Sequence, residues 1–331
     1  MSRLEEEIAE IPQRLKGVAE TNLPALRDAG RRFAAEPPPA FFTIARGTSD
    51  AVAAYAAYRL TQALQIPVGS FAPSLATLDG VKPNAGGVWT LAISQSGQSP
   101  DLVAAQEAFS GDESGVRIAL VNDIDSPLSV GADIVLDQAA GEEKSVAATK
   151  SFACSLLAVD LLAEALDGDE NGMNARGEHV AKAVALAMGN PVDLSPLDQA
   201  ANAYVIGRGV SLPVAEEAAL KLKETCGLHA EAISAAEVMH GPRAIAGKQL
   251  PVLGFAGPGA AGQSVVEALR ALATQGSPTR LVTVADLPAE IASAAPIPLI
   301  GSFYVSLPAL ARRRGRDPDR PPSLSKVTLT H

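Results

Sequence analysis

One stretch of the chain carries side chains that could transfer protons. Residues 213–242 read PVAEEAALKLKETCGLHAEAISAAEVMHGP and place Lys221 three residues before Glu224, on one face of an expected helix. A carboxylate whose pKa is raised by partial burial can both accept and donate a proton. His240, followed by Gly and Pro, would lie where a helix ends, and His229 lies within the same helical pattern. Spacing alone favours a solvated ion pair, and a histidine there can simply complement the helix dipole.

A second stretch could hold an anion. LAISQSGQSPD, residues 91–101, begins as an apolar strand and breaks into small hydroxyl and amide residues before a helix. A helix N-terminus offers unpaired N–H groups and a partial positive charge, and Ser and Gln side chains add neutral donors around a phosphate. The alternative is an N-cap and a turn, although one cap needs one Ser and this loop has three.

Two further segments could contact a ligand. GEEKSVAATKSF, residues 141–152, leads from an expected strand into a helix through small residues, which would let a ligand approach the backbone closely. A plain helix start is the alternative. The segment DRPPSLSKVTLT, residues 319–330, carries an extended Pro-rich stretch into Lys326. A polar end of this kind is also typical of a disordered tail.

The elements that must position these residues repeat along the chain. At an offset of 162 residues, IARGTSDAVA (44–53) aligns with IGRGVSLPVA (206–215), and the end of LAISQSG aligns with LGFAGPG (253–259). Each half therefore alternates strands and helices through Gly-containing turns. This alternation predicts an α/β fold of two tandem domains related by duplication, each a doubly wound parallel sheet flanked by helices. Ligands are expected outside the carboxyl ends of the strands.

The limits of these domains follow from the same pattern. Residues 1–25 are expected to form an N-terminal helical segment, residues 26–192 the first domain, and residues 193–331 the second domain with the tail. Gly, Asn and Pro residues in 188–199 mark the join. The second turn carries hydroxyls in the first half and reads AGPGAAG in the second. We therefore expect one phosphate site, in the first half.

Composition favours small-molecule chemistry. The 331 residues carry a net charge of −10, which argues against a nucleic-acid surface. The beginning of the chain shows no apolar signal segment, so a cytoplasmic protein is expected. The uncharged stretch 291–311 is interrupted by prolines and predicts a buried strand and helix rather than a membrane span. Cys154 and Cys226 offer neither a disulfide framework nor metal-ligand spacing, and no metal or other cofactor is expected.

Together these motifs resemble the sugar isomerase (SIS) family, and most closely the isomerase half of glucosamine-6-phosphate synthase and the stand-alone SIS-type glucosamine-6-phosphate deaminases. The resemblance covers residues 25–330 and rests on ARGTS, ISQSGQS, SVAATKSF, KLKE, HGP and SLSKVTL, in this order. Arg46 departs from the synthase pattern, in which a Cys is common. We expect little consequence, because this side chain precedes the phosphate-contacting pair.

The resemblance implies which residues hold the substrate. It assigns the phosphate to six residues: Thr48, Ser49, Ser94, Gln95, Ser96 and Ser99. It assigns the sugar hydroxyls to the backbone around Val146 and Ala147 and to the tail near Ser325.

The resemblance also implies which residues act on the sugar. Glu224 matches the proton-shuttling carboxylate and Lys221 its neighbour. His240 matches the group that helps to open the sugar ring, and Lys326 matches the tail lysine. In the family this histidine reaches into the site of a neighbouring subunit, which implies a homodimer. The expected partners are therefore a sugar phosphate and a second copy of the chain, not nucleic acid or a membrane.

The implied activity is that of a phosphosugar aldose–ketose isomerase or deaminase, converting glucosamine 6-phosphate and water to fructose 6-phosphate and ammonia. Moving a carbonyl between C1 and C2 passes through an enediol or enolamine and needs one group to carry the proton. Too few residues precede the first domain for a glutaminase domain, so a synthase is not expected. The alternatives are a fructosamine-6-phosphate deglycase and a sugar-phosphate-binding regulator. Retention of Glu224, His240 and Lys326 favours catalysis.

Overall fold

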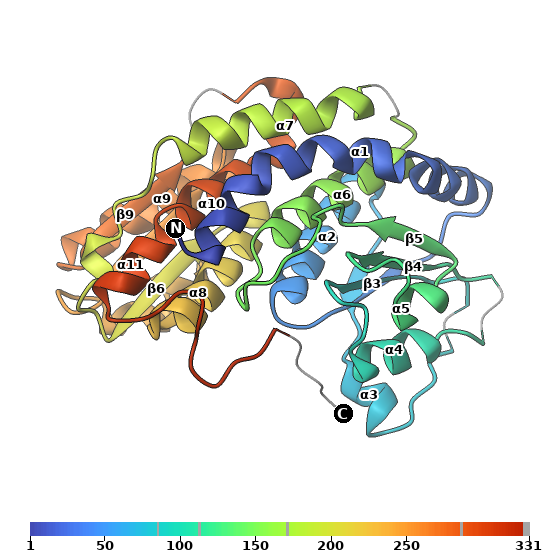
Figure 1. The fold of residues 1–331 in the computed structure, drawn as a ribbon, viewed down its shortest axis with the longest axis horizontal. Coiled ribbons are helices and arrows are strands. Elements are labelled where there is room, and N and C mark those ends of the chain that lie inside the picture. The colour runs from blue at the N-terminus through green and yellow to red at the C-terminus, as the bar shows by residue number, and fades with distance from the viewer. Residues whose placement is uncertain (85, 112–113, 170–171, 285–286, 327–331) are drawn as a thin grey trace. The chain divides into compact units, whose positions relative to one another are not determined.

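The chain forms two compact units whose segments interleave in the sequence. A computed structural model describes residues 1–84, 86–111, 114–169, 172–284 and 287–326 (Figure 1). Within these residues, the first-sheet unit comprises Arg14–Glu142 and Cys154–Gly177. The second-sheet unit comprises Met1–Gln13, Glu143–Ala153 and Glu178–Lys326. Three helices are divided between the units: α1 (Arg3–Ala35), α6 (Lys150–Leu166) and α7 (Met173–Met188). The domain limits expected from sequence stay a prediction.

The first-sheet unit holds a five-stranded parallel sheet in the order β2-β1-β3-β4-β5. Its strands are β1 (Phe41–Ile44), β2 (Val68–Ser70), β3 (Trp89–Ser94), β4 (Arg117–Val121) and β5 (Ile134–Asp137). Its other helices are α2 (Thr48–Leu64), α3 (Pro73–Thr77), α4 (Pro100–Glu107) and α5 (Pro127–Val130). Every residue of β3 is buried, which is typical of a parallel strand covered on both faces.

The second-sheet unit holds a four-stranded parallel sheet in the order β7-β6-β8-β9. Its strands are β6 (Asn202–Gly207), β7 (His229–Ser234), β8 (Val252–Ala256) and β9 (Thr279–Thr283). Its other α-helices are α8 (Leu212–Cys226), α9 (Gly259–Thr274), α10 (Pro296–Tyr304) and α11 (Leu307–Arg313). Short 3₁₀ helices are η1 (Ser195–Leu197), η2 (Gly209–Ser211), η3 (Glu237–Met239), η4 (Gly241–Ile245) and η5 (Ala289–Ala294). Helix α8 packs on β6 and β7, and α9 packs on β8 and β9.

The two sheets have the same strand order in their first four strands, which confirms the predicted α/β class with two parallel sheets. Adding the offset of 162 to β1, β2, β3 and β4 gives ranges that overlap β6, β7, β8 and β9, and the range from β4 coincides with β9. Gly47 and Gly209 occupy matching turns, and both have a φ of 57°, a conformation that favours glycine. The offset found in short motifs therefore extends to backbone geometry.

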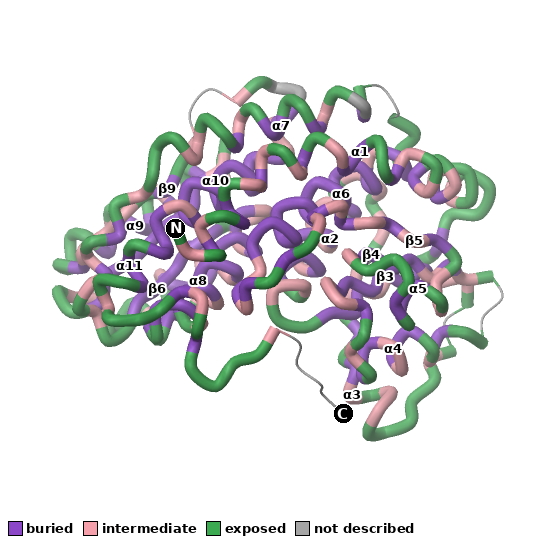
Figure 2. Tube along the Cα trace, in the orientation of Figure 1, coloured by how far each residue is buried: buried purple, intermediate pink, exposed green. Residues whose placement is uncertain are grey.

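Residues 291–313 form helices and not the expected strand and helix. Pro296 is the first residue of α10, where its fixed φ and missing N–H are tolerated, whereas prolines would interrupt the hydrogen bonds of a central strand. The segment passes a length and hydropathy test for a membrane span, but 89% of its apolar window is buried within the structure. Figure 2 shows α10 in the buried class along its length. Packing against the sheet and α8 explains its apolar character.

His229 also differs from the expectation. It begins strand β7, because α8 ends at Cys226 and Gly227 follows with a φ of 58° in the left-handed region. The helical pattern is therefore interrupted before the histidine.

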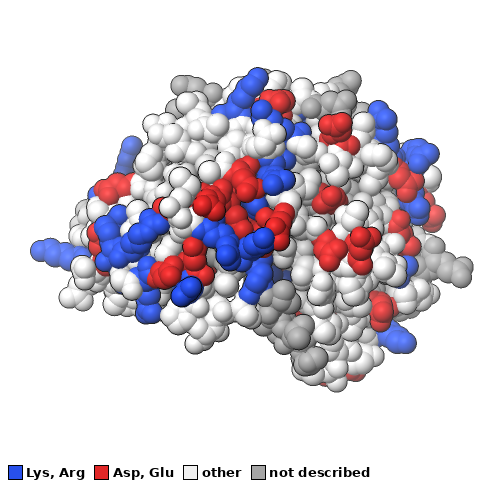
Figure 3. Space-filling view, viewed as in Figure 1, with Lys and Arg blue, Asp and Glu red and all other residues white. Residues whose placement is uncertain are grey.

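Charged side chains of both signs are interspersed on the face shown in Figure 3. In the second-sheet unit, Arg312 Nη2 lies 2.7 Å from Glu5 Oε2, and Arg313 Nε lies 2.8 Å from Asp198 Oδ1. These partly exposed pairs contribute little to stability.

Candidate active site

Helix α8 brings Lys221 and Glu224 into one ion pair. Lys221 Nζ donates a hydrogen bond of 2.5 Å to Glu224 Oε2. The Lys221 side chain is 1% exposed and that of Glu224 is 21% exposed. The pair is therefore not the solvated surface pair that spacing alone favours. A buried ammonium keeps its charge only if it is paired with an anion. Lys221 therefore depends on neighbouring carboxylates such as Glu224.

Glu217, one helical turn earlier, places a second carboxylate beside the Lys221 ammonium. Its fully buried carboxylate lies 3.5 Å from Lys221 Nζ and accepts a hydrogen bond of 2.7 Å from Tyr304 Oη on α10. Burial alone would lower the pKa of Lys221, but the carboxylates of Glu217 and Glu224 raise it above its ordinary value. Burial, together with Glu217, raises the pKa of Tyr304 well above its ordinary value. Lys221 thus stays a cation and Tyr304 a donor, and Glu224 is the partly exposed member of the cluster.

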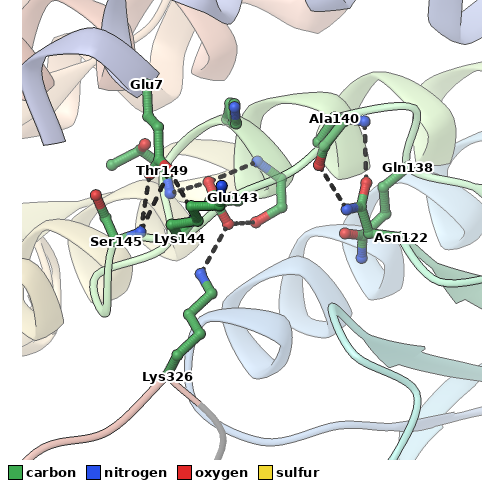
Figure 4. A network of polar contacts seen from close by, with 12 residues as sticks. Glu7, Asn122, Gln138, Ala140, Glu143, Lys144, Ser145, Thr149 and Lys326 are labelled. Carbon is green, nitrogen blue, oxygen red and sulfur yellow. Dashed lines mark hydrogen bonds and ion pairs between the residues drawn. The ribbon is translucent and has the colours of Figure 1, made fainter. Parts of the chain in front are cut away.

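Glu143 joins the tail to the loop that precedes α6 (Figure 4). Its buried carboxylate accepts hydrogen bonds from the backbone N–H of Thr149 at 2.9 Å and of Ser151 at 3.2 Å, and from the Ser151 hydroxyl at 2.6 Å. Lys326 Nζ donates to the same carboxylate at 3.2 Å. Burial would raise the pKa of Glu143, but Lys326 and these hydrogen bonds lower it below its ordinary value. Glu143 is therefore an anion near neutral pH and holds Lys326 in place.

The first turns of α1 hold the other side of this loop. Glu7 accepts hydrogen bonds from the backbone N–H of Lys144 at 2.5 Å and of Ser145 at 3.2 Å (Figure 4). Glu10 Oε2 lies 2.8 Å from Nζ of Lys150, whose side chain is 1% exposed. The backbone around residues 146–147, predicted to contact the sugar, therefore lies between two carboxylate anchors.

Two buried hydroxyls flank this backbone. Ser145 Oγ and Thr149 Oγ1 have no hydrogen-bond partner among the residues that the structure describes. The two residues are 2% and 0% exposed, respectively. An unsatisfied buried hydroxyl costs free energy, so each would gain from a polar group supplied by a ligand or by water.

The 94–99 loop joins β3 to α4 in the first-sheet unit. Ser94 Oγ accepts a hydrogen bond of 3.1 Å from Gly97 N, and Ser96 Oγ accepts one of 3.3 Å from Gln98 N. Gly97 has a φ of 61°, and a Cβ there would lie 2.0 Å from Ser126 Oγ, so glycine is required for this close turn. Ser99 occupies the N-cap of α4 but makes no capping bond through its side chain. Its hydroxyl is therefore not used in the way that the capping alternative requires.

Thr48 and Ser49 lie at the neighbouring strand. They begin α2 just after β1, and β1 pairs directly with β3 in the sheet. Within this unit, the predicted phosphate-binding residues therefore follow the carboxyl ends of two adjacent parallel strands. Both segments lead into a helix N-terminus, which is the arrangement that favours anion binding.

The remaining predicted residues lie at the surface of the second-sheet unit. His240 is exposed on the turn between η3 and η4. Ser325 is exposed in the tail. Residues 327–329 of the SLSKVTL motif lie outside the described part of the chain.

Sequence reasoning missed four residues of this cluster: Glu7, Glu143, Glu217 and Tyr304. Glu143 lies within the segment 141–152, where the small residues are the signal, and Glu217 lies four residues before Lys221 in the same helical pattern. No local spacing signal joins Glu7 or Tyr304 to their partners, which lie 137 to 138 and 87 residues away in the sequence.

The chain belongs to the SIS domain family, whose pattern matches residues 39–165 and 197–296. The two matched segments contain β1 to β5 and β6 to β9, respectively. They include the 94–99 loop and Glu217, Lys221 and Glu224 of α8.

A curated relative supports this assignment. The chain is 34% identical over 259 residues to the glutamine–fructose-6-phosphate aminotransferase (isomerizing) of Pyrobaculum aerophilum, which covers 72% of this chain and 43% of that protein. The chain thus spans about half the length of the curated relatives that it matches.

Two solved structures resemble the whole chain. One, described as a "putative phosphosugar isomerase" from Silicibacter pomeroyi DSS-3, is 35% identical with a TM-score of 0.87 and covers 96% of this chain and 100% of that one. The glucosamine-6-phosphate deaminase of Thermotoga maritima has a TM-score of 0.80 at 19% identity, over 99% of this chain and 100% of that one, and shows the shared fold alone.

Proposed function

We propose that the chain is a phosphosugar isomerase that works as a deaminase, converting glucosamine 6-phosphate and water to fructose 6-phosphate and ammonia. The names of the relatives support sugar-phosphate chemistry at the level of the family. The choice of substrate within that class is the proposal.

The observation that carries this proposal is the Lys221–Glu224 pair. A buried ammonium, held by Glu217 on one side, donates to a carboxylate that is 21% exposed. Such a carboxylate can receive a proton from a substrate while the neighbouring positive charge stabilises an oxyanion. A protein that only binds a sugar phosphate has no need of this pair.

In the proposed reaction, Glu224 removes the proton from C2 of the open-chain amino sugar and returns it to C1. The resulting C2 imine is hydrolysed by water, which releases ammonia and leaves the ketone of fructose 6-phosphate. His240 assists ring opening, since an imidazole can exchange protons near neutral pH. Lys221 and Lys326 stabilise negative charge that develops on oxygen.

The phosphate is assigned to the 94–99 loop together with Thr48 and Ser49. Neutral hydroxyls can hold a phosphate there because helix N-termini supply much of the favourable field. The proposed assembly is a homodimer in which His240 serves the neighbouring copy, and its exposure on a turn is compatible with that role.

A substrate panel tests this proposal. Purified protein is incubated with glucosamine 6-phosphate, galactosamine 6-phosphate and a set of fructosamine 6-phosphates, and ammonia, free amine and ketose phosphate are measured. Ammonia and fructose 6-phosphate should appear in equal amounts from glucosamine 6-phosphate. The Glu224→Gln variant is the matched control for non-enzymatic release.

Each of the other outcomes contradicts a different part of the proposed function. Amine release from the fructosamine 6-phosphates alone would make the protein a deglycase. A rise in melting temperature with sugar phosphate but no turnover of any member would make it a sugar-phosphate-binding regulator.

A further inference from the structure

Arg46 connects the two turns that carry the predicted phosphate-binding residues. It lies in the turn between β1 and α2, and its Nε lies 3.1 Å from Oδ2 of Asp101 in the first turn of α4. The Asp101 side chain is 3% exposed, whereas that of Arg46 is 53% exposed. One end of the guanidinium is therefore fixed by a buried carboxylate while much of the side chain remains open to solvent.

Arg46 carries the positive charge of these two turns. The sequence has no other Lys or Arg in residues 33–58 and none in residues 83–116. Asp50 and Asp101 lie in the first turns of α2 and α4. Burial raises the pKa of Asp50 and the nearby Arg46 opposes that rise, so the guanidinium acts on this carboxyl as well. Without Arg46, the first turns of α2 and α4 would carry two carboxylates, and these segments would have no side-chain cation.

The second half of the chain provides an internal comparison. Arg208 occupies the position that matches Arg46 at the offset of 162 residues, but its Nη1 donates a hydrogen bond of 3.0 Å to Ser234 Oγ. The position that matches Asp101 is Gln263, and the first turn of α9 carries no acidic residue. Arg46 thus contacts the first turn of α4, in the half that has the hydroxyl loop. Arg208, at the matching position, contacts the end of β7, in the half that lacks this loop.

We propose that Arg46 binds the substrate phosphate directly, with Asp101 fixing its Nε and its terminal nitrogens donating to the anion. This inference rests on the proposed function and adds a cation to a binding loop that otherwise depends on neutral donors. A guanidinium is suited to this role, because its planar donors fit two phosphate oxygens at once and its charge persists at all physiological pH values. The departure of Arg46 from the synthase pattern then has a consequence: stronger selection for a phosphorylated sugar.

The test compares four variants of the full chain: Arg46→Gln, Asp101→Asn, the double variant, and Arg208→Gln as the matched control. KM and kcat are measured for glucosamine 6-phosphate, and inorganic phosphate is titrated as a competitive inhibitor. Arg46→Gln should raise KM and the inhibition constant of phosphate about 10-fold or more, with kcat within about twofold of the native value, because the charged hydrogen bonds of the guanidinium to the phosphate are lost. Arg208→Gln should change neither constant.

The double variant separates direct binding from charge neutralisation. If Arg46 touches the phosphate, removing Asp101 as well leaves the affinity for inorganic phosphate weak. Recovery of native affinity in the double variant would show that Arg46 only offsets Asp101 and would overturn the proposal. Equal effects of Arg46→Gln and Arg208→Gln would overturn it too.

Arg46→Lys is a second variant that keeps the test valid if Arg46→Gln does not fold. It keeps the charge but cannot both pair with Asp101 and bind two oxygens, so its affinity should fall between those of the native protein and Arg46→Gln. A native protein that binds neither inorganic phosphate nor any sugar phosphate would overturn the proposed function and this inference together. A native protein that binds phosphate and an Arg46→Gln variant that binds it equally well would overturn the inference alone.

Discussion

Helices α2 and α8 occupy matching positions in the two halves, and their side chains can be compared one by one. At the offset of 162 residues, Tyr55, Arg59 and Gln62 of α2 match Glu217, Lys221 and Glu224 of α8. In the first half, Tyr55 Oη donates to Asp160 of α6 at 2.7 Å, and Arg59 Nε donates to the same oxygen at 2.6 Å. Both halves therefore bring together a buried tyrosine, a buried carboxylate and a cation, which is 14% exposed in Arg59 and 1% exposed in Lys221.

The difference lies one turn further along each helix. Arg59 Nη1 donates to the amide oxygen of Gln62 at 3.2 Å, whereas Lys221 Nζ donates to the carboxylate of Glu224 at 2.5 Å. The tyrosine and carboxylate also exchange places, since the carboxylate lies on α8 but on α6 in the first half. The shared trio is thus a structural element of each half, and the added carboxylate is specific to the second. The 94–99 loop shows the opposite distribution, because its hydroxyls are present in the first half and absent from the matching turn of the second half.

Replacing Glu224 by Gln gives α8 the residue that α2 carries at this position. We expect kcat to fall about 10²- to 10⁴-fold, because the proton carrier is lost, while KM changes little. Steady-state assays with glucosamine 6-phosphate measure this, and substrate deuterated at C2 should show a primary isotope effect in the native protein. Gln62→Glu is the matched control and should leave kcat unchanged. Near-native turnover of Glu224→Gln would mean that the proton carrier lies elsewhere.

Removing the hydroxyls of the loop makes the first half resemble the second. The double variant Ser94→Ala/Ser96→Ala should raise KM about 100-fold with much less effect on kcat, because two hydrogen bonds to a charged group are lost. Ser211→Ala, which changes the residue matching Ser49 in the second half, is the control and should leave KM unchanged. A fall in kcat at constant KM would place the loop outside the phosphate site.

Mixing two inactive variants tests whether two copies of the chain contribute residues to one site. If His240 serves the neighbouring subunit, Glu224→Gln and His240→Asn chains should form heterodimers in which one site is intact and the other lacks both groups. Random exchange should restore about a quarter of native activity, because about half of the dimers are mixed and each has one intact site. No recovery after demonstrated subunit exchange would place His240 in the site of its own chain or outside any site.

The smallest expected effects separate the two trios. Tyr55→Phe and Tyr304→Phe should each lower the free energy of unfolding by about 1–3 kcal/mol, since each leaves a buried carboxylate with one donor fewer. Urea denaturation measures this loss. Tyr304→Phe should also lower kcat severalfold through Glu217 and Lys221, whereas Tyr55→Phe should leave kcat unchanged. Equal kcat values for the two variants would mean that Tyr304 has no influence on the proposed proton carrier.

The fold was predictable from sequence because its signals are periodic and repeated. The matching of residues 44–53 with 206–215 identified the duplication, and strand-to-turn patterns such as LAISQSG located β3. Strand β7 was missed because HAEAIS has few of the β-branched and aromatic residues that mark strands. It pairs with β6 on one side, so tertiary context outweighs its local preference.

The candidate site was predictable only in part. Lys221 and Glu224 are three residues apart, so their pairing follows from helical spacing, but their burial depends on how α10 packs over α8. Glu143 and Lys326 are 183 residues apart, and their contact depends on the path of the tail. A single sequence carries no local signal for contacts that only the folded chain brings about.

Asp319 links the segment that leads to Lys326 with the first turn of α1. Its carboxylate accepts hydrogen bonds from the backbone N–H of Arg3 at 2.8 Å and of Leu4 at 2.9 Å, and so caps α1 from the opposite end of the sequence. The segment that leads to Lys326 is therefore fastened to the first turn of α1. Removal of residues 1–4 would therefore release the segment around Asp319, which lies more than 300 residues away in the sequence.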